Sequence, residues 1–250
     1  LDELEPGRVW QVIEVAWPDV QAASGAVDLE PVRRALDKAK ADAAGPRVLA
    51  LSAEHPEFGR WGAQGFEAPP SAGGDTQVAV ERYRSAWLGT IRAISREFGP
   101  EVDWYLLADL VPPPGAPRAA EQLALEVKTA SVTLRAEDPG AAVAVRVPAG
   151  PAVALLAEAY RKTGDLDAYI EGVSLETGLE TPLKSTMEDT RARLREVDPG
   201  TSVWVELRLA RDLEPEALTD RSLARAAEWI TAGADLALLP LTEGAAEATL

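Results

Sequence analysis

Polar side chains recur where the hydrophobic runs of this chain end, and most of these side chains are carboxylates. Paired carboxylates can serve as a proton donor and as a nucleophile or base, the two roles that hydrolysis of a glycosidic bond requires. Asp and Glu are common throughout the chain, so an acidic residue is a candidate for function only because of its position at the end of a predicted strand. The residues at these points are Glu14, Glu54, His55, Asp109, Arg146, Glu176, Glu206 and Arg208.

Seven short runs rich in β-branched and aromatic residues predict the strands that would carry these groups. The first of them, RVWQVIEVA, is typical of a buried strand. The strands are expected over residues 8–16, 47–52, 102–107, 142–147, 170–175, 202–209 and 235–239.

Amphipathic segments between these runs predict helices. The clearest spans 76–98, where Val80, Tyr83 and Trp87 begin an apolar face with spacings of three and four residues. The stretch 53–75 is expected to be a long loop, and such loops are usually functional or mobile. The remaining helices are expected from Asp28 to Gly45, around 123–134, and over 153–162, 183–197 and 221–231.

The alternation of strands and helices predicts an α/β fold, a (β/α)8 TIM barrel that forms one domain over residues 1–250. Right-handed crossovers would make its sheet parallel. Seven strands leave the barrel one short, so the eighth is expected before Leu1, within 53–75, or elsewhere outside residues 1–250. An open doubly wound sheet is the alternative, although the glycine-rich phosphate loop typical of that fold is absent.

In parallel barrels the active site lies at the carboxyl ends of the strands. The fold therefore predicts that Glu54, Asp109, Glu176 and Glu206 lie on one rim. A metal-dependent enzyme with Glu14 and three of these residues as oxygen ligands stays an alternative, without a spacing motif to support it. No cofactor is expected.

The composition excludes several classes of function. With 41 acidic against 25 basic residues, the net charge is −16, which argues against binding nucleic-acid phosphates or docking on an anionic membrane. The absence of Cys excludes disulfides, thiolate metal sites and cysteine nucleophiles, and the single His excludes multi-histidine metal sites. No apolar run approaches the roughly 20 residues of a membrane span, so membrane insertion is not expected.

Several short motifs follow one another in the order found in one large group of enzymes. They are W-x-x-V at Trp17, Gly25 and Asp28 before a helix, Pro56 and Trp61-Gly62 after a strand, Tyr83, Phe98-Gly99, Val102-Asp103-Trp104, EGVSLET at 171–177 and VWVEL at 203–207. Together they resemble the large clan of retaining glycoside hydrolases built on (β/α)8 barrels. The resemblance covers most of the chain, and each of its motifs is short.

The resemblance implies a site for a polysaccharide or oligosaccharide. VWVEL is similar to the strand whose terminal Glu is the nucleophile, which makes Glu206 the expected nucleophile and Asp109 the expected general acid/base. The expected substrate-binding residues are Glu54, Glu176 and Arg208, together with His55, which faces the mouth or is a loop residue without a role, and Trp17 and Trp61, which stack on sugar rings or pack in the core.

Departures from the family pattern predict weak or lost hydrolysis. Ala108-Asp109-Leu110 stands where the family has Asn-Glu-Pro. The shorter Asp would place its proton about an ångström from the usual position, and such an error can cost on the order of a hundredfold in rate. Ala108 cannot bind the sugar 2-hydroxyl, and Glu176 replaces an expected His.

Two functions follow from this combination of motifs and departures. The first is a secreted or cell-surface barrel that acts on or binds a polysaccharide, with weak or lost hydrolytic activity. The second is a non-catalytic barrel that serves as a binding or assembly module at the cell surface, with a protein partner.

The chain lacks Asn and Cys and carries 20 Arg, a composition that predicts thermostability. A GC-rich genome would produce the same bias with no effect on stability. Thermostability predicts a calorimetric unfolding midpoint above the mesophile range of about 45–65 °C. A midpoint inside that range would indicate that the lack of Asn and the excess of Arg reflect a GC-rich genome and not thermostability.

Overall fold

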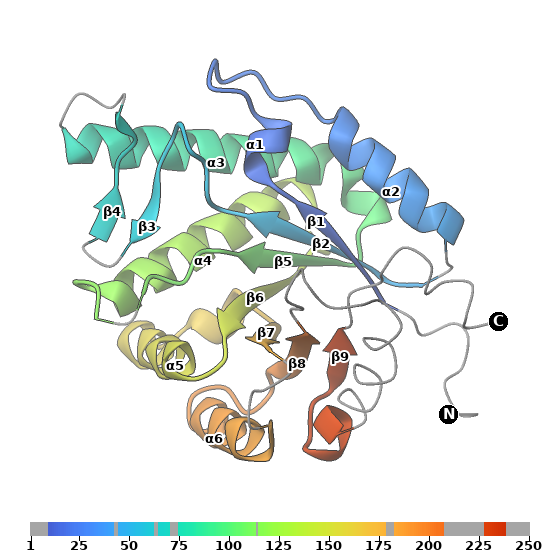
Figure 1. Cartoon of the computed structure of the whole chain (residues 1–250), viewed down its shortest axis with the longest axis vertical. Helices are drawn as coiled ribbons and strands as arrows, with labels where there is room; N and C mark the ends of the chain where they lie inside the picture. Colours follow the sequence, from blue (N-terminus) through green and yellow to red (C-terminus); the bar gives the residue numbers. More distant parts are fainter. Residues whose placement is uncertain are drawn as a thin grey trace.

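Seven parallel strands form one curled sheet, and helices cover its outer face (Figure 1). The structure is a computed structural model that describes residues 10–42, 45–62, 65–70, 75–113, 115–178, 183–207 and 228–238. Strands that are neighbours in this sheet follow one another in the chain, so each crossover adds a strand at the same edge. The strands are β1 (Gln11–Val15), β2 (Arg47–Ser52), β5 (Trp104–Ala108), β6 (Ala142–Pro148), β7 (Gly172–Thr177), β8 (Ser202–Leu207) and β9 (Leu236–Leu238).

The longest helix, α3 (Thr76–Phe98), begins and ends at the residues that its sequence predicts. The carboxylate of Asp75 accepts hydrogen bonds from the backbone N–H groups of Gln77 and Val78, and Gly99 ends the helix. Among the described residues, no helix combines the length and apolar character needed to cross a membrane. The other helices are α1 (Trp17–Val20), α2 (Glu30–Asp42), α4 (Ala119–Glu137), α5 (Pro151–Thr163) and α6 (Leu183–Arg195), with 3-10 turns at Gly99–Glu101 and Leu166–Ala168.

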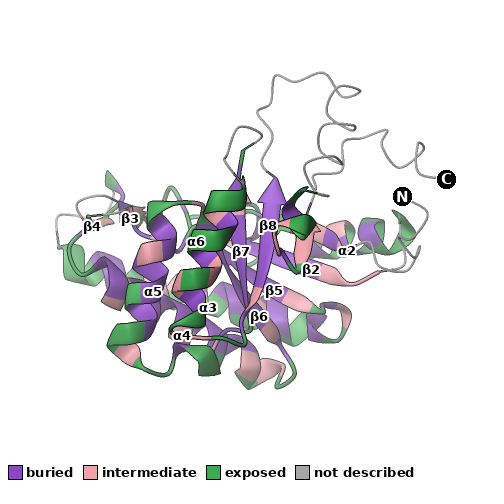
Figure 2. Ribbon diagram, turned by 90° about the horizontal axis from the view of Figure 1, so that it is seen from below, coloured by how far each residue is buried: buried purple, intermediate pink, exposed green. Residues whose placement is uncertain are grey.

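The sheet is buried on both faces, while the helices keep exposed outer faces (Figure 2). Alternate strand residues such as Leu49, Tyr105 and Val145 belong to the main core, which includes the helices. The residues between them, such as Val48 and Leu106, form a second apolar cluster inside the curl. Burial on both faces explains why the strand sequences are nearly continuous apolar runs.

Three indole rings fill the interior toward the amino ends of the strands. The ring centroids of Trp104 on β5 and Trp204 on β8 lie 4.6 Å apart, and Trp10 packs on them at 6.1 and 5.5 Å, respectively. Two strands separate β5 from β8 in the sheet, so this contact crosses the interior. A β-carbon at Gly172 would lie 3.3 Å from the Ala144 side chain and 3.4 Å from the Trp204 ring. The missing side chain at this position therefore leaves space for the indoles.

The predicted barrel fold and its seven strands are confirmed. The open doubly wound sheet is wrong, because the inner face of the sheet packs against itself and, within the described residues, not against a second layer of helices. Five of the expected helices are present at or near their expected positions. Of the sixth, expected over 221–231, residues 228–231 are helical and the rest lies outside the described residues.

The stretch 53–75 is not the simple loop that the sequence predicts. It contains an antiparallel hairpin of β3 (Arg60–Gly62) and β4 (Gly65–Glu67). Phe66 packs edge-on against Tyr83 of α3, with ring centroids 5.2 Å apart. The hairpin forms a sheet of its own, so it does not supply an eighth barrel strand, and β1 and β9 are the two edges of the main sheet within the described residues.

Candidate functional site

The parallel strands bring the four predicted carboxylates to one edge of the sheet. Glu54 follows β2 by two residues, and Asp109 directly follows β5, the neighbouring strand. Glu176 on β7 is paired in register with Glu206 on β8. All four therefore lie at the carboxyl-terminal rim, as the fold predicts.

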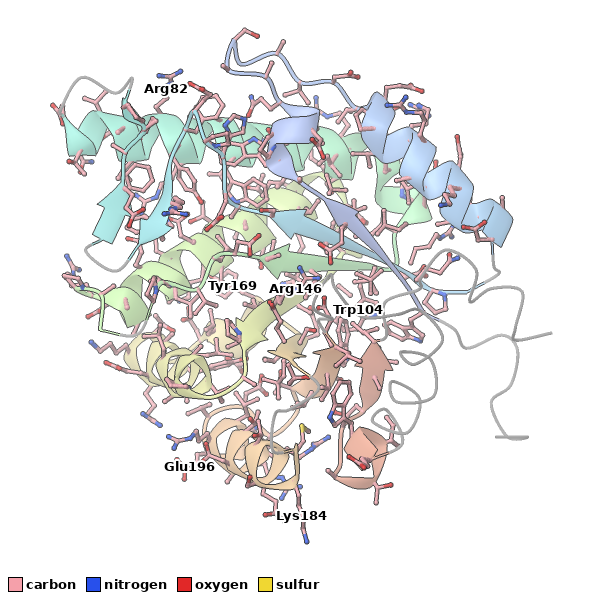
Figure 3. All side chains as sticks on the ribbon, viewed as in Figure 1. Arg82, Trp104, Arg146, Tyr169, Lys184 and Glu196 are labelled. Carbon is pink, nitrogen blue, oxygen red and sulfur yellow. The ribbon has the colours of Figure 1, made fainter. Side chains whose placement is uncertain are left out.

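A buried arginine links three strands inside this rim. Arg146 on β6 donates a hydrogen bond from Nε to Oε2 of Glu206 on β8 at 2.8 Å. Its two Nη atoms donate to the carboxylate of Glu14 on β1 at 3.2 and 2.5 Å. Ser174 on β7 adds a longer hydrogen bond to Oε2 of Glu206 at 3.4 Å. Arg146 lies near the centre of the strands (Figure 3), and we call Glu14, Arg146 and Glu206 the central ion-pair cluster.

The central ion-pair cluster is buried at Arg146 and Glu206 and exposed at Glu14. The side chains of Arg146 and Glu206 are 2% and 9% exposed, whereas that of Glu14 is 51% exposed. Burial opposes the charge of Arg146, but the hydrogen bonds and charges of the two carboxylates outweigh it and raise the pKa of the guanidinium. The arginine therefore stays charged and forms an ion pair with Glu206, the residue that the sequence predicts as nucleophile. The sequence places Arg146 at a strand end but does not indicate this role.

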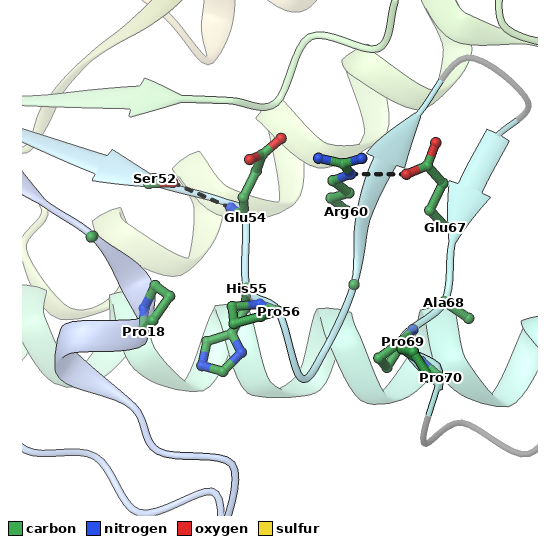
Figure 4. A pocket seen from close by; sticks show the side chains of 12 residues that line it. Pro18, Ser52, Glu54, His55, Pro56, Arg60, Glu67, Ala68, Pro69 and Pro70 are labelled. Atoms are coloured by element: carbon green, nitrogen blue, oxygen red, sulfur yellow. Dashed lines mark hydrogen bonds and ion pairs between the residues drawn. The ribbon is translucent and has the colours of Figure 1, made fainter. Parts of the chain in front are cut away.

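A cavity of about 500 Å³ lies on the other side of the rim, between the end of β2 and the β3–β4 hairpin (Figure 4). Arg60 on β3 forms an ion pair with Glu67 on β4, with Nε 2.8 Å from Oε2. The backbone N–H of Glu54 donates a hydrogen bond to Oγ of Ser52 at 3.3 Å. The cavity is lined by Ala16, Pro18, Ser52, Glu54, His55, Pro56, Gly59, Arg60, Glu67, Ala68, Pro69 and Pro70.

The surroundings of Glu54 raise the pKa of its carboxyl. Desolvation raises its pKa first, and the charges of Asp109 and Glu67 raise it further, while Arg60 lowers it. Asp109 has a φ of 59°, a left-handed conformation that Asp adopts more readily than most residues. The sequence pairs Asp109 with Glu206, but electrostatically its partner is Glu54. The negative charges of Glu54 and Asp109 therefore repel each other at this part of the rim.

The structure places Trp17 and His55 in the core, so neither offers a ring face to a sugar. Trp17 is 1% exposed, stacks on Phe58 with a centroid separation of 5.3 Å, and donates from Nε1 to Oε1 of Gln21 at 2.8 Å. His55 is 4% exposed; its Nε2 donates to the backbone carbonyl of Gln21, and its Nδ1 accepts from the N–H of Glu57. Through these two hydrogen bonds the imidazole links the loop after β2 to the backbone of Gln21.

The remaining predicted residues have different positions. Trp61 lies half-buried on β3 and packs edge-on against Phe66, with ring centroids 5.3 Å apart. Arg208 lies outside the described residues. Within the described ranges, no group of three or more His, Asp or Glu side chains is arranged to hold a metal ion. Glu14 and Glu206, two ligands of the metal-dependent alternative, contact Arg146 instead.

Comparison with known proteins identifies the architecture. No protein-family model and no curated protein sequence matches the chain. A family 10 glycoside hydrolase, an endoxylanase retrieved from a sugarcane soil metagenome, matches its structure with a TM-score of 0.62 over 94% of this chain and 85% of the other, at 10% identity. The chain has the barrel fold of glycoside hydrolases.

Two further structures share this glycoside-hydrolase barrel fold. A psychrophilic family 10 endo-β-1,4-xylanase matches with a TM-score of 0.61 and 11% identity, over 91% of this chain and 78% of the enzyme. A family 39 glycoside hydrolase from the gut symbiont Bacteroides cellulosilyticus also gives 0.61 and 11%, over 93% of this chain and 50% of that one. The motif resemblance in the sequence and these structural neighbours agree on the fold.

Arg146→Met tests the central ion-pair cluster. Removing the guanidinium leaves Glu206 buried beside a neutral side chain, and breaking a buried ion pair in this way costs about 3–5 kcal/mol. We expect a loss of that size in the free energy of unfolding measured in urea. Adding Glu206→Gln to Arg146→Met should restore part of it. Arg33→Met, which removes an exposed ion pair with Glu97, is the control and should cost less than about 1 kcal/mol.

Glu54→Gln tests the raised pKa of Glu54. A carboxyl whose pKa is raised by folding stabilises the folded state when protonated, and this contribution is lost as the pH rises through the raised pKa. Gln does not ionise, so the variant should be more stable than the native chain at pH 7, by up to about 1 kcal/mol for so exposed a group. The gain should vanish below about pH 4. Glu67→Gln, which breaks the ion pair with Arg60, should give no gain, and a less stable Glu54→Gln at pH 7 would contradict the prediction.

Proposed function

We propose that this protein binds an oligosaccharide or polysaccharide at the carboxyl-terminal rim of its barrel and has lost the fast hydrolysis of a retaining glycosidase. The observation that carries the proposal is the hydrogen bond that Arg146 donates to Glu206, in which Nε of Arg146 lies 2.8 Å from Oε2 of Glu206. The residue that resembles a nucleophile is therefore part of a buried salt bridge.

Retaining hydrolysis requires a carboxylate oxygen that reaches the anomeric carbon of the sugar. The side chain of Glu206 is 9% exposed, and Oε2 already accepts hydrogen bonds from Arg146 and Ser174. Attack through Oε1 would have to come from a largely buried side chain whose negative charge is drawn toward Arg146, and both features make the carboxylate a weaker nucleophile. Ala108 and Asp109, the replacements at the second catalytic position, weaken the reaction further.

The cavity beside β2 supports the binding half of the proposal. Its volume of about 500 Å³ falls within the range of about 300–1,000 Å³ that is typical of small-molecule sites. Proline rings on one side can pack against the C–H faces of a sugar. The polar groups of Glu54, Arg60 and Ser52 can form hydrogen bonds with its hydroxyls. Two structural neighbours are xylanases by name, which favours a β-linked polysaccharide as the first ligand to test. A secreted or cell-surface location belongs to this proposal, because such polysaccharides are extracellular.

The test compares the native chain with Glu206→Gln. Both proteins are incubated with aryl β-glycosides and with soluble xylan and β-glucans, and released reducing ends are measured against a buffer blank. We expect neither protein to exceed the blank, and both to bind the same polysaccharide in affinity electrophoresis. Thermal unfolding confirms that the variant is folded at the assay temperature. Cleavage by the native chain that Glu206→Gln abolishes would show instead that the protein is a hydrolase with Glu206 as nucleophile.

A further inference from the structure

The cavity beside β2 has one polar side and one apolar side. Glu54, Arg60 and Glu67 form a polar row, and Pro18, Pro56, Pro69 and Pro70 line the opposite side (Figure 4). The row joins two parts of the chain, because Glu54 follows a barrel strand while Arg60 and Glu67 lie on the hairpin. A ligand in the cavity would therefore meet barrel and hairpin together.

The charges around this cavity are unbalanced. Glu54 and Glu67 line it, and the charge of Asp109 acts on Glu54 from the neighbouring strand end. Arg60 is the one cationic side chain among the described lining residues, and Glu67 already binds it at 2.8 Å. His55 is also engaged through both ring nitrogens. An anionic ligand would thus meet carboxylates and no cation that is not already paired.

We propose that the cavity selects glycans that carry protonated amino groups, such as 2-amino-2-deoxyhexoses, over neutral sugars, and that it rejects uronic acids. This inference rests on the proposed function, since it specifies the ligand of the same site. An ammonium group can donate three hydrogen bonds. It would also place beside Glu54 a positive charge that is not already paired with Glu67. It would relieve the repulsion between Glu54 and the nearby carboxylates, while the proline side accepts the C–H face of the ring.

The direct test measures the affinity of three β-1,4-linked trisaccharides by isothermal titration calorimetry. They are the trimers of glucosamine, glucose and glucuronic acid, used at a pH where the amino groups are protonated. We expect the glucosamine trimer to bind about tenfold more tightly than the glucose trimer, the scale of one added charged hydrogen bond. The glucuronic acid trimer should bind most weakly.

Two variants separate the cavity from the general attraction of an acidic protein for cations. Glu54→Gln should weaken binding of the glucosamine trimer much more than binding of the glucose trimer, so that the ratio of the two affinities falls to about one. Asp109→Asn should weaken glucosamine binding in the same direction. Glu158→Gln removes the same charge from the exposed face of α5 and should change neither affinity. Thermal unfolding of each variant establishes that it is folded.

The outcomes distinguish this inference from the proposed function. If the glucose trimer binds as tightly as the glucosamine trimer, or if Glu54→Gln and Glu158→Gln act alike, the selectivity is overturned while carbohydrate binding stands. If none of the three trimers binds although xylan or a β-glucan binds in affinity electrophoresis, the inference fails and carbohydrate binding stands. If nothing binds in either experiment, the proposed function fails and the inference fails with it.

Discussion

One buried guanidinium joins three strands of this sheet that are not neighbours. Arg146 on β6 contacts Glu14 on β1 and Glu206 on β8, and backbone hydrogen bonds between adjacent strands cannot make such a connection. Because the charged hydrogen bonds cross the interior, they hold the two ends of the curled sheet toward each other. The same bonds occupy Glu206. The interaction that links these strands thus also involves the residue expected to be the nucleophile.

The rim is divided into two electrostatically different halves. On the side of β1, β6 and β8, one arginine is shared by two carboxylates. On the side of β2, β5 and the hairpin, Glu54 and Asp109 face each other's charge, and Arg60 is bound to Glu67. In the first half, Arg146 and Glu206 are buried and Arg146 links three strands, whereas the second half borders a cavity. The proposed ligand site therefore lies in the second half.

The sequence predicts the elements well and their long-range contacts poorly. The helix over 76–98 was predictable because its apolar face repeats regularly and Asp75 caps it, and the strands were predictable because both of their faces are apolar. The hairpin was missed because its strands have three residues each, and Ala63-Gln64 between them is not one of the residue pairs that signal a two-residue hairpin turn. The contact between Arg146 and Glu14 joins residues 132 positions apart, and no local pattern encodes it.

The roles of individual aromatic residues depended on the same long-range packing. Trp17 looks like a rim residue because it follows the first strand, but it is 1% exposed among other aromatic side chains. A ring next to a strand end can turn to the solvent or to the covering helices, and only the position of α3 decides between the two. Rim carboxylates are more predictable, because burying them without a partner is costly.

The three indoles at the amino ends of the strands determine how a polymer can meet this barrel. Trp10, Trp104 and Trp204 pack against one another across the interior, and Arg146 and Glu206 are buried nearer the carboxyl ends of the strands. The described part of the interior is therefore packed with side chains from one end toward the other. A polymer bound at the rim, as proposed, would lie across it and could not pass through the barrel.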